Sequence, residues 1–247
     1  MEQITILGSS NAVAKLGQEN THLFIDTPDR KIMVDCGDNP MAKLTAIGTS
    51  INEITDLVLT HFHADHLGSL PLLIMDMWLE KRQMPLTIHG LEYTLDRAKR
   101  LLELFNWQNW QNMFQVEFNV IAESGSQGFI TGKDVTVSAL SVLHLVPTIG
   151  LRFEFKNGRV VTYSCDTEPC DNLFRLAQNA DVLMQEAAGE SKGHTSAKQA
   201  GEIATKCHVK KLVLIHYERR HGEETLVSEA CKRFGGEVVL AQDLMRV

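Results

Sequence analysis

The chain has 247 residues, of which 44% are hydrophobic and 22% are charged, and its formal net charge is −7. These proportions are typical of a soluble globular protein, and they exclude a disordered chain, a fibrous protein and a coiled coil. The negative charge disfavours tight, sequence-independent binding to nucleic acid, which attracts positively charged proteins.

Composition also predicts where the protein works. The five cysteines are too few and too scattered for a disulfide framework, which favours a reducing compartment. No segment approaches the roughly 20 apolar residues of a membrane span. The first residues lack the basic and apolar regions of a signal peptide. We therefore expect a cytoplasmic protein without membrane contact.

Strand-like and helical runs alternate along the chain, and no Pro/Gly/Ser-rich linker divides it, so we expect one domain over residues 1–247. The periodicity predicts strands at 4–7, 23–26, 31–35, 57–60, 86–89, 116–121, 133–140, 149–155, 160–164, 182–185, 212–215 and 237–240. It predicts helices at 70–81, 94–105, 172–178, 197–207 and 224–234, and a second short helix at 107–114. Asn157-Gly158 predicts a hairpin turn, because these residues tolerate positive φ.

The aromatic helical segment 94–114 contains Trp107, Trp110 and Phe114 at helical spacing. Such spacing favours packing in the core or against another subunit. A lid over a neighbouring site is the alternative.

The stretch with the clearest chemistry is Thr60-His61-Phe62-His63-Ala64-Asp65-His66-Leu67-Gly68. Imidazole and carboxylate groups are ligands of zinc, manganese and iron. At the end of a strand, alternation puts His61 and His63 on the same side. Asp65 and His66 lie past the turn, where they could face a second metal ion. A polar surface turn is the alternative, but histidines rarely cluster in this way.

The same pattern is echoed later in the chain. Residues 57–62 (LVLTHF) and 212–217 (LVLIHY) are both apolar runs that end in a histidine and an aromatic residue. Runs of this type are typical of buried strands. The echo suggests two half-domains that share one site.

The motif His61-x-His63-x-Asp65-His66 resembles the signature of the metallo-β-lactamase fold superfamily. Further elements follow in the order of that family. The resemblance implies a four-layer αββα sandwich, in which two mixed β-sheets are flanked by helices. It also implies a first metal held by His61, His63 and His144, a second held by Asp65, His66 and His216, Asp166 between them, and Asp35 in support of the metal-binding loop.

A second stretch is similar to the ribonuclease Z-like phosphodiesterase branch of this family. There a Glu-Ala pair ends a strand, as at Glu186, and a Gly-His-Thr-Ser segment opens a helix, as at 193–196. Ser196 and Gln199 form a capping box in the sequence, and the helix N-terminus offers N–H groups to an anion. His194 is placed to protonate a leaving oxygen, Glu186 to orient it, and Thr195 and Ser196 to bind the phosphate. An ordinary helix cap preceded by a surface histidine is the alternative.

Three departures separate this chain from tRNA 3′-processing enzymes of that branch. Gln185 stands where those enzymes usually carry histidine, and the region 11–21 keeps Asn20 but has no proline. The interval between Asp166 and Glu186 is too short for their basic, tRNA-gripping arm. Extended nucleic-acid binding is therefore disfavoured.

The sequence thus predicts a metal-dependent hydrolase, foremost a phosphodiesterase of small or short substrates. In that prediction a hydroxide bridging two divalent metal ions attacks phosphorus, with Zn²⁺ preferred over Mn²⁺ or Fe²⁺. Asp65 orients or deprotonates the water, and His194 assists the leaving group. The first alternative is a dinuclear-zinc hydrolase of lactones, carboxylic esters or β-lactam-like substrates, with no strong role for His194. The others are tRNA 3′-processing and a metal-stabilised binding protein without catalysis.

The resemblance also implies a homodimer. Arg219 and Arg220 are candidates for a phosphate contact.

Overall fold

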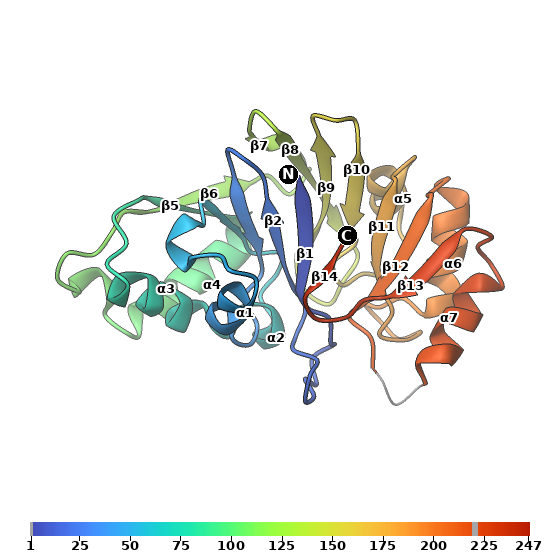
Figure 1. The fold of residues 1–247 in the computed structure, drawn as a ribbon, viewed down its shortest axis with the longest axis horizontal. Coiled ribbons are helices and arrows are strands. Elements are labelled where there is room, and N and C mark those ends of the chain that lie inside the picture. Colours follow the sequence, from blue (N-terminus) through green and yellow to red (C-terminus); the bar gives the residue numbers. More distant parts are fainter. Residues whose placement is uncertain (1, 219–221) are drawn as a thin grey trace.

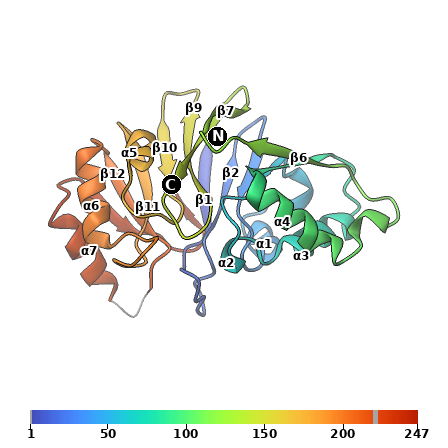
Figure 2. The ribbon, with the colours of Figure 1, turned by 180° about the vertical axis from the view of Figure 1, so that it is seen from behind.

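The computed structural model describes residues 2–218 and 222–247, so Arg219 and Arg220 lie outside the described residues. Two mixed sheets of seven strands pack against each other and carry helices on their outer faces (Figure 1 and Figure 2). The predicted αββα sandwich is therefore confirmed. No helix among the described residues is long and apolar enough to cross a membrane.

The N-terminal sheet has the strand order β14-β1-β2-β3-β4-β5-β6, and its strands β3 to β6 run parallel. Its strands are β1 (Gln3–Gly8), β2 (His22–Asp26), β3 (Lys31–Val34), β4 (Asp56–Val58), β5 (Leu86–Leu91), β6 (Val116–Ile121) and β14 (Met245–Arg246). The helical elements of this half are α1 (Pro40–Ala46), η1 (Ile51–Glu53), α2 (Ala64–Leu67), α3 (Leu70–Leu79), α4 (Glu92–Glu103) and η2 (Trp107–Asn109).

The C-terminal sheet has the order β13-β12-β11-β10-β9-β8-β7, and β10 to β13 run parallel. Its strands are β7 (Ser126–Thr131), β8 (Val135–Val142), β9 (Thr148–Phe155), β10 (Val160–Tyr163), β11 (Val182–Glu186), β12 (Lys211–Ile215) and β13 (Glu237–Leu240). The helices of this half are α5 (Asp171–Ala177), α6 (Ala197–Lys206) and α7 (Glu223–Cys231). Gly158 adopts φ +87° in the turn between β9 and β10, as the Asn-Gly pair predicts.

The predicted helix at 107–114 is wrong. Asn106 has left-handed backbone angles, which end the preceding helical path, and only the short 3₁₀ turn η2 follows. The aromatic segment nevertheless packs inward, because Trp107 and Phe114 belong to the core cluster under the N-terminal sheet.

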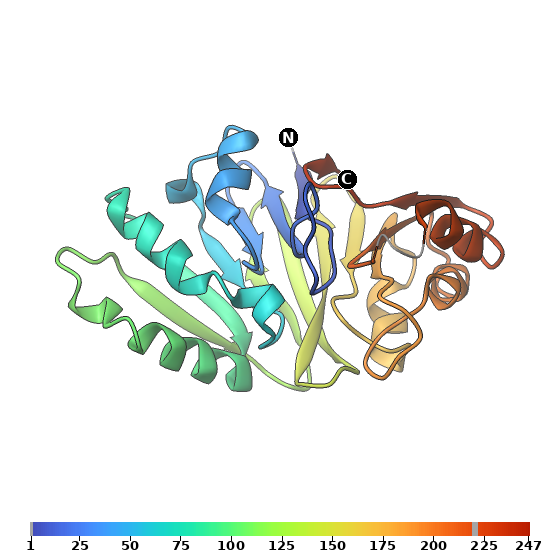
Figure 3. The ribbon, with the colours of Figure 1, turned by 90° about the horizontal axis from the view of Figure 1, so that it is seen from below.

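Two apolar clusters hold the layers together. One fills the space between the sheets and extends under α5, α6 and α7. The other joins the outer face of the N-terminal sheet to α1, α3 and α4. Because the parallel strands of each sheet end at the same edge, the segments that follow β3, β4, β10, β11 and β12 meet there. Helix α2 marks this edge at the bottom of Figure 1, and Figure 3 views the molecule from that side.

Candidate metal centre

The predicted metal-binding residues converge from four segments at the edge where the sheets meet. His61, His63, Asp65 and His66 follow β4, and His144 follows β8. Asp166 follows β10, and His216 follows β12. His216 has φ +53°, and its backbone N–H donates to the carbonyl of Ser9 at 3.0 Å. A left-handed residue that is not glycine is often found at a functional site, where the surroundings hold it in place.

Three imidazole nitrogens and one carboxylate oxygen form the first group. His63 Nδ1 lies 3.0 Å from His61 Nε2 and 3.2 Å from His144 Nε2. Asp166 Oδ2 lies 3.9 Å from His61 Nε2 and 3.8 Å from His144 Nε2. Tetrahedral zinc with Zn–N bonds of about 2.05 Å separates its nitrogen ligands by about 3.3 Å. The spacing and chemistry of this group therefore fit a metal ion.

The second group lies on the other side of Asp166. His216 Nε2 is 3.4 Å from Asp65 Oδ2 and 3.5 Å from Asp166 Oδ2. His66 Nε2 is 3.6 Å from Asp65 Oδ2 and 3.5 Å from Asp166 Oδ1. Both His66 Nε2 and Asp166 Oδ1 are buried without a hydrogen-bond partner. Buried polar atoms normally have partners, so these two atoms also fit a bound cation.

The protonation states favour metal binding in the first group. Burial lowers the pKa of His61, His63 and His144, well below the ordinary range for His61, so the three rings are neutral, which is the form that binds metal. Burial opposes ionisation of Asp166, but the charges of His216 and His66 hold the pKa of Asp166 well below its ordinary value. Asp166 is thus an anion between the two groups.

His66 differs from the other rings. Burial opposes its charge, but Asp166 and Asp35 raise the pKa of His66 well above the ordinary value. A metal ion at His66 Nε2 must therefore displace a proton.

Asp35 lies behind the two groups and is fully buried. Its carboxylate accepts hydrogen bonds from the backbone N–H of Thr60 at 2.8 Å and from the Thr60 hydroxyl at 2.7 Å. His66 Nδ1 contacts Asp35 Oδ2 at 2.8 Å. Asp35 thus ties the end of β4 to α2, on either side of the loop that the sequence predicts to bind metal.

Glu186 and His194 form a pair beside the two groups. His194 Nδ1 lies 3.0 Å from Glu186 Oε1, and the same oxygen accepts from the backbone N–H of Thr167 and Thr195. The His194 ring lies 5.0 Å from the ring of His144 and stacks on that of His216 at 5.9 Å. The hydrogen bond with Glu186 raises the pKa of His194 against the opposing effect of burial. His194 is therefore equipped to carry a proton.

Thr195 and Ser196 use their polar groups inside the protein. The Thr195 hydroxyl donates to the carbonyl of Thr167, and the side chain is fully buried. The Ser196 hydroxyl accepts from the backbone N–H of Gln199 and caps α6, in the capping box that the sequence predicts. Neither hydroxyl is directed to the metal groups by these bonds.

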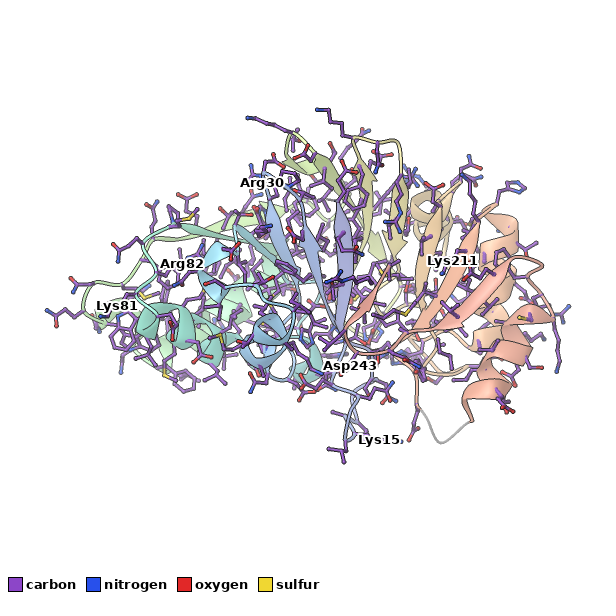
Figure 4. All side chains as sticks on the ribbon, viewed as in Figure 1. Lys15, Arg30, Lys81, Arg82, Lys211 and Asp243 are labelled. Carbon is purple, nitrogen blue, oxygen red and sulfur yellow. The ribbon has the colours of Figure 1, made fainter. Side chains whose placement is uncertain are left out.

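Sequence reasoning missed three residues that hold the centre. Cys165 has its Sγ 3.5 Å from His61 Nδ1. Thr60 contacts the same nitrogen with its hydroxyl. Asp243, near the C-terminus, holds the loop between β1 and β2 by accepting from Ser9 and from the backbone N–H of Glu19 (Figure 4). In the sequence, Thr60 immediately precedes His61 and Cys165 immediately precedes Asp166. This position beside a predicted metal-binding residue is the only sequence feature that points to either of them.

Comparison with known proteins extends this picture. The chain is 25% identical, over an alignment of 303 positions, to a protein named ribonuclease Z from Methanothermobacter thermautotrophicus, covering all of this chain and 96% of that relative. The metallo-β-lactamase fold protein YhfI from Bacillus subtilis superposes with a TM-score of 0.86 at 20% identity, covering 99% of this chain and 98% of that one. Human tRNase Z, short form (ELAC1), superposes with a TM-score of 0.79 at 22% identity, with the same coverage.

The fold of these solved structures is the fold described above, and their likeness spans almost the whole chain. Residues 2–234 match the family described as anti-Pycsar protein Apyc1. Because that match runs from β1 to α7 and takes in every residue of the two groups, the chain belongs to the anti-Pycsar protein Apyc1 family, with the metallo-β-lactamase fold.

Proposed function

We propose that this metal-dependent, ribonuclease Z-like hydrolase is a phosphodiesterase that acts on small phosphodiesters. The observation that carries the proposal is the hydrogen bond of 3.0 Å between Glu186 and His194, next to the two His/Asp groups. A histidine whose pKa is raised by a buried carboxylate supplies the proton that an alkoxide leaving group needs. The relatives named ribonuclease Z fit phosphodiester chemistry.

In the proposed assignment, His61, His63 and His144 hold one divalent ion, and Asp65, His66 and His216 hold a second. Asp166, whose carboxylate lies between the two groups, would be shared by both ions, and zinc would be the preferred ion because nitrogen ligands predominate. Bound ions of this kind act as Lewis acids toward phosphoryl oxygens and lower the pKa of bound water.

The protein's own residues supply the remaining chemistry. The bond from His216 and the charge of His66 outweigh burial and lower the pKa of Asp65, so its carboxylate is ionised and accepts a hydrogen bond from water. His194 donates a proton from Nε2 to the departing oxygen, because Glu186 occupies its Nδ1 side. Glu186 is itself held by the backbone N–H groups of Thr167 and Thr195. These bonds fix the direction in which His194 donates.

A small substrate is favoured over a tRNA precursor. The formal charge of −7 opposes the polyanionic backbone of a long nucleic acid. In the structure, 166–186 holds only α5, β11 and their connections, in place of the basic arm that a tRNA-processing enzyme carries. We assign Thr195 and Ser196 no contact with phosphate, because both hydroxyls are used internally.

The test is hydrolysis of bis(p-nitrophenyl) phosphate by protein stripped with a chelator and then reloaded with Zn²⁺ or Mn²⁺. We expect turnover that requires metal and that is lost in Asp166→Ala. His208→Ala, which changes an exposed histidine, is the matched control and should keep full activity. A fully metallated protein that leaves this substrate intact but cleaves a lactone or a carboxylic ester would overturn the phosphodiesterase assignment.

We also propose that the protein is a homodimer that pairs through the apolar face of α3 and the segment after α4. Leu104 is 78% exposed and Phe105 54% exposed there. Phe105 adjoins a groove lined by Gly68, Pro71, Leu72, Met75 and Trp110. An apolar surface of this kind is costly in water, and a second copy would cover it.

The five unpaired cysteines support a reducing location such as the cytoplasm.

A further inference from the structure

The Thr60 hydroxyl lies between two of the residues at the metal centre. It donates to Asp35 Oδ2 at 2.7 Å and lies 3.1 Å from His61 Nδ1. Thr60 is fully buried, so water does not replace either contact. Because the hydroxyl has one proton, and Asp35 receives it, the oxygen must accept from His61.

This direction fixes the tautomer of His61. The proton sits on Nδ1, and Nε2 keeps its free lone pair toward His63 and Asp166. His66 is oriented by a direct contact, because its Nδ1 lies 2.8 Å from Asp35 Oδ2. One carboxylate therefore orients two histidines, one directly and one through a hydroxyl.

The two histidines belong to different groups. In the proposed assignment His61 lies with His63 and His144, whereas His66 lies with Asp65 and His216, and Cys165 is close to both His61 and His66. Asp35 thus reaches both groups, but Thr60 reaches only the first. The other neighbour of His61 Nδ1 is Cys165 Sγ at 3.5 Å, a longer contact to a weaker acceptor.

We propose that Thr60 is a positioning residue for the first metal site alone, and that Asp35 governs the first site through Thr60 and the second site directly. The inference rests on the proposed assignment of the two metal sites. Partners that orient metal-binding histidines typically change metal affinity by roughly 10–100-fold when they are removed. Loss of the Thr60 hydroxyl therefore weakens one site of the two.

The experiment measures stepwise Zn²⁺ affinities by competition with a chromophoric chelator. His144→Ala and His216→Ala identify which step belongs to which group. We expect Thr60→Val to weaken the same step as His144→Ala by roughly 10–100-fold and to leave the other step unchanged. Asp35→Asn should weaken both steps. Thr60→Ser, which keeps the hydroxyl, should bind as the wild type does.

Two outcomes would overturn the inference. One is Thr60→Val with both affinities unchanged, and the other is Thr60→Val with both steps weakened equally. If Thr60→Val fails to fold, the ¹⁵N chemical shifts of the His61 ring in the metal-free wild type show which ring nitrogen carries the proton. A proton on Nε2 contradicts the proposal. A wild type that binds no Zn²⁺ would instead refute the proposed metal sites themselves.

Discussion

Glu186 Oε1 lies 3.0 Å from His194 Nδ1 and is wholly shielded from solvent, whereas His194 is partly exposed. The carboxylate also accepts from three backbone N–H groups, those of Thr167, Thr195 and Ala188. A buried anion held in this way favours the protonated form of its neighbour. The pair therefore makes His194 a proton donor over a wider pH range than an isolated histidine.

The first prediction concerns pH. Because Glu186 raises the pKa of His194, the acid form is lost only when the pH rises through that higher value. Glu186→Gln should lower the pKa of His194 and move the alkaline limb of the kcat profile to lower pH. Glu154→Gln, a change on the surface, is the control. An alkaline limb that stays in place in Glu186→Gln would remove His194 from this role.

The second prediction concerns the leaving group. p-Nitrophenolate departs without protonation, whereas the alkoxide of a ribose in a cyclic nucleotide needs a proton. His194→Ala should therefore cost roughly 10²–10⁴-fold in kcat on the alkyl ester and much less on bis(p-nitrophenyl) phosphate. The comparison is made with both substrates on the same metal-loaded preparation. Equal losses on both would mean that His194 binds the phosphoryl group and does not act as an acid.

Most of the fold follows from local patterns. Apolar runs such as 57–60 and 212–215 predict strands, and the structure has β4 and β12 there. The sequence does not predict α1 and β7, because their local patterns of apolar residues are weak. Only Pro40 and Leu44 of α1 are buried, and β7 carries a register irregularity with Gly128 at φ +63°. Their positions are set by the sheet and core that they join.

The sequence predicts only part of the candidate site. The three histidines and one aspartate within residues 61–66 indicate a metal site by themselves. The order in which the family's motifs follow one another along the chain suggests His144, Asp166 and His216. The bond between Asp35 and Thr60 spans 25 positions of sequence, and it exists because β3 and β4 are parallel neighbours. A contact of that kind depends on strand pairing and has no local pattern.

The third prediction tests the packing beneath the metal-binding loop. A Cβ on Gly37 would lie 2.1 Å from the carbonyl oxygen of Asp65, so alanine there must push the backbone of the loop. Gly37→Ala should lower the free energy of unfolding by about 1–3 kcal/mol and weaken Zn²⁺ binding. Gly235→Ala, where a Cβ meets open space, should change neither. Urea unfolding and chelator competition give the two readouts, and an unaffected Gly37→Ala would contradict the geometry.

The fourth prediction tests the proposed dimer face. Wild-type protein should have the mass of a dimer in light scattering coupled to size exclusion. Leu104→Lys and Phe105→Lys should shift it to monomer, because burying a charge in the interface is costly. Leu16→Lys changes a fully exposed leucine in the loop between β1 and β2 and should keep the wild-type mass. A monomeric wild type, or a dimer that survives both substitutions, would show that this face does not pair.

Arg82 is a buried cation with an unusual environment. Its side chain lies close to the α3–β5 end of the molecule and is 2% exposed (Figure 4). Burial lowers its pKa to about 10, so it stays protonated at neutral pH. Its guanidinium donates to the backbone carbonyls of Ile51, Asn52, Ile54, Met84 and Pro85.

The fifth prediction follows from those carbonyls. Arg82→Met keeps the length of the side chain but leaves buried acceptors without a donor, each of which costs about 1–3 kcal/mol unless water enters. We expect a loss of about 3 kcal/mol or more in the free energy of unfolding, measured with urea. Arg175→Ala, which removes an exposed arginine bonded to Asn172 at 3.3 Å, should change stability by less than about 0.5 kcal/mol. An Arg82→Met protein as stable as the wild type would mean that the loop at 51–54 and the start of β5 satisfy their carbonyls in another way. These segments precede the parallel strands β4 and β5, whereas His61 and its neighbours follow β4 at the other edge of the sheet. Zn²⁺ affinity of the folded variant should therefore stay unchanged, which separates a stabilising role for Arg82 from a role in the site.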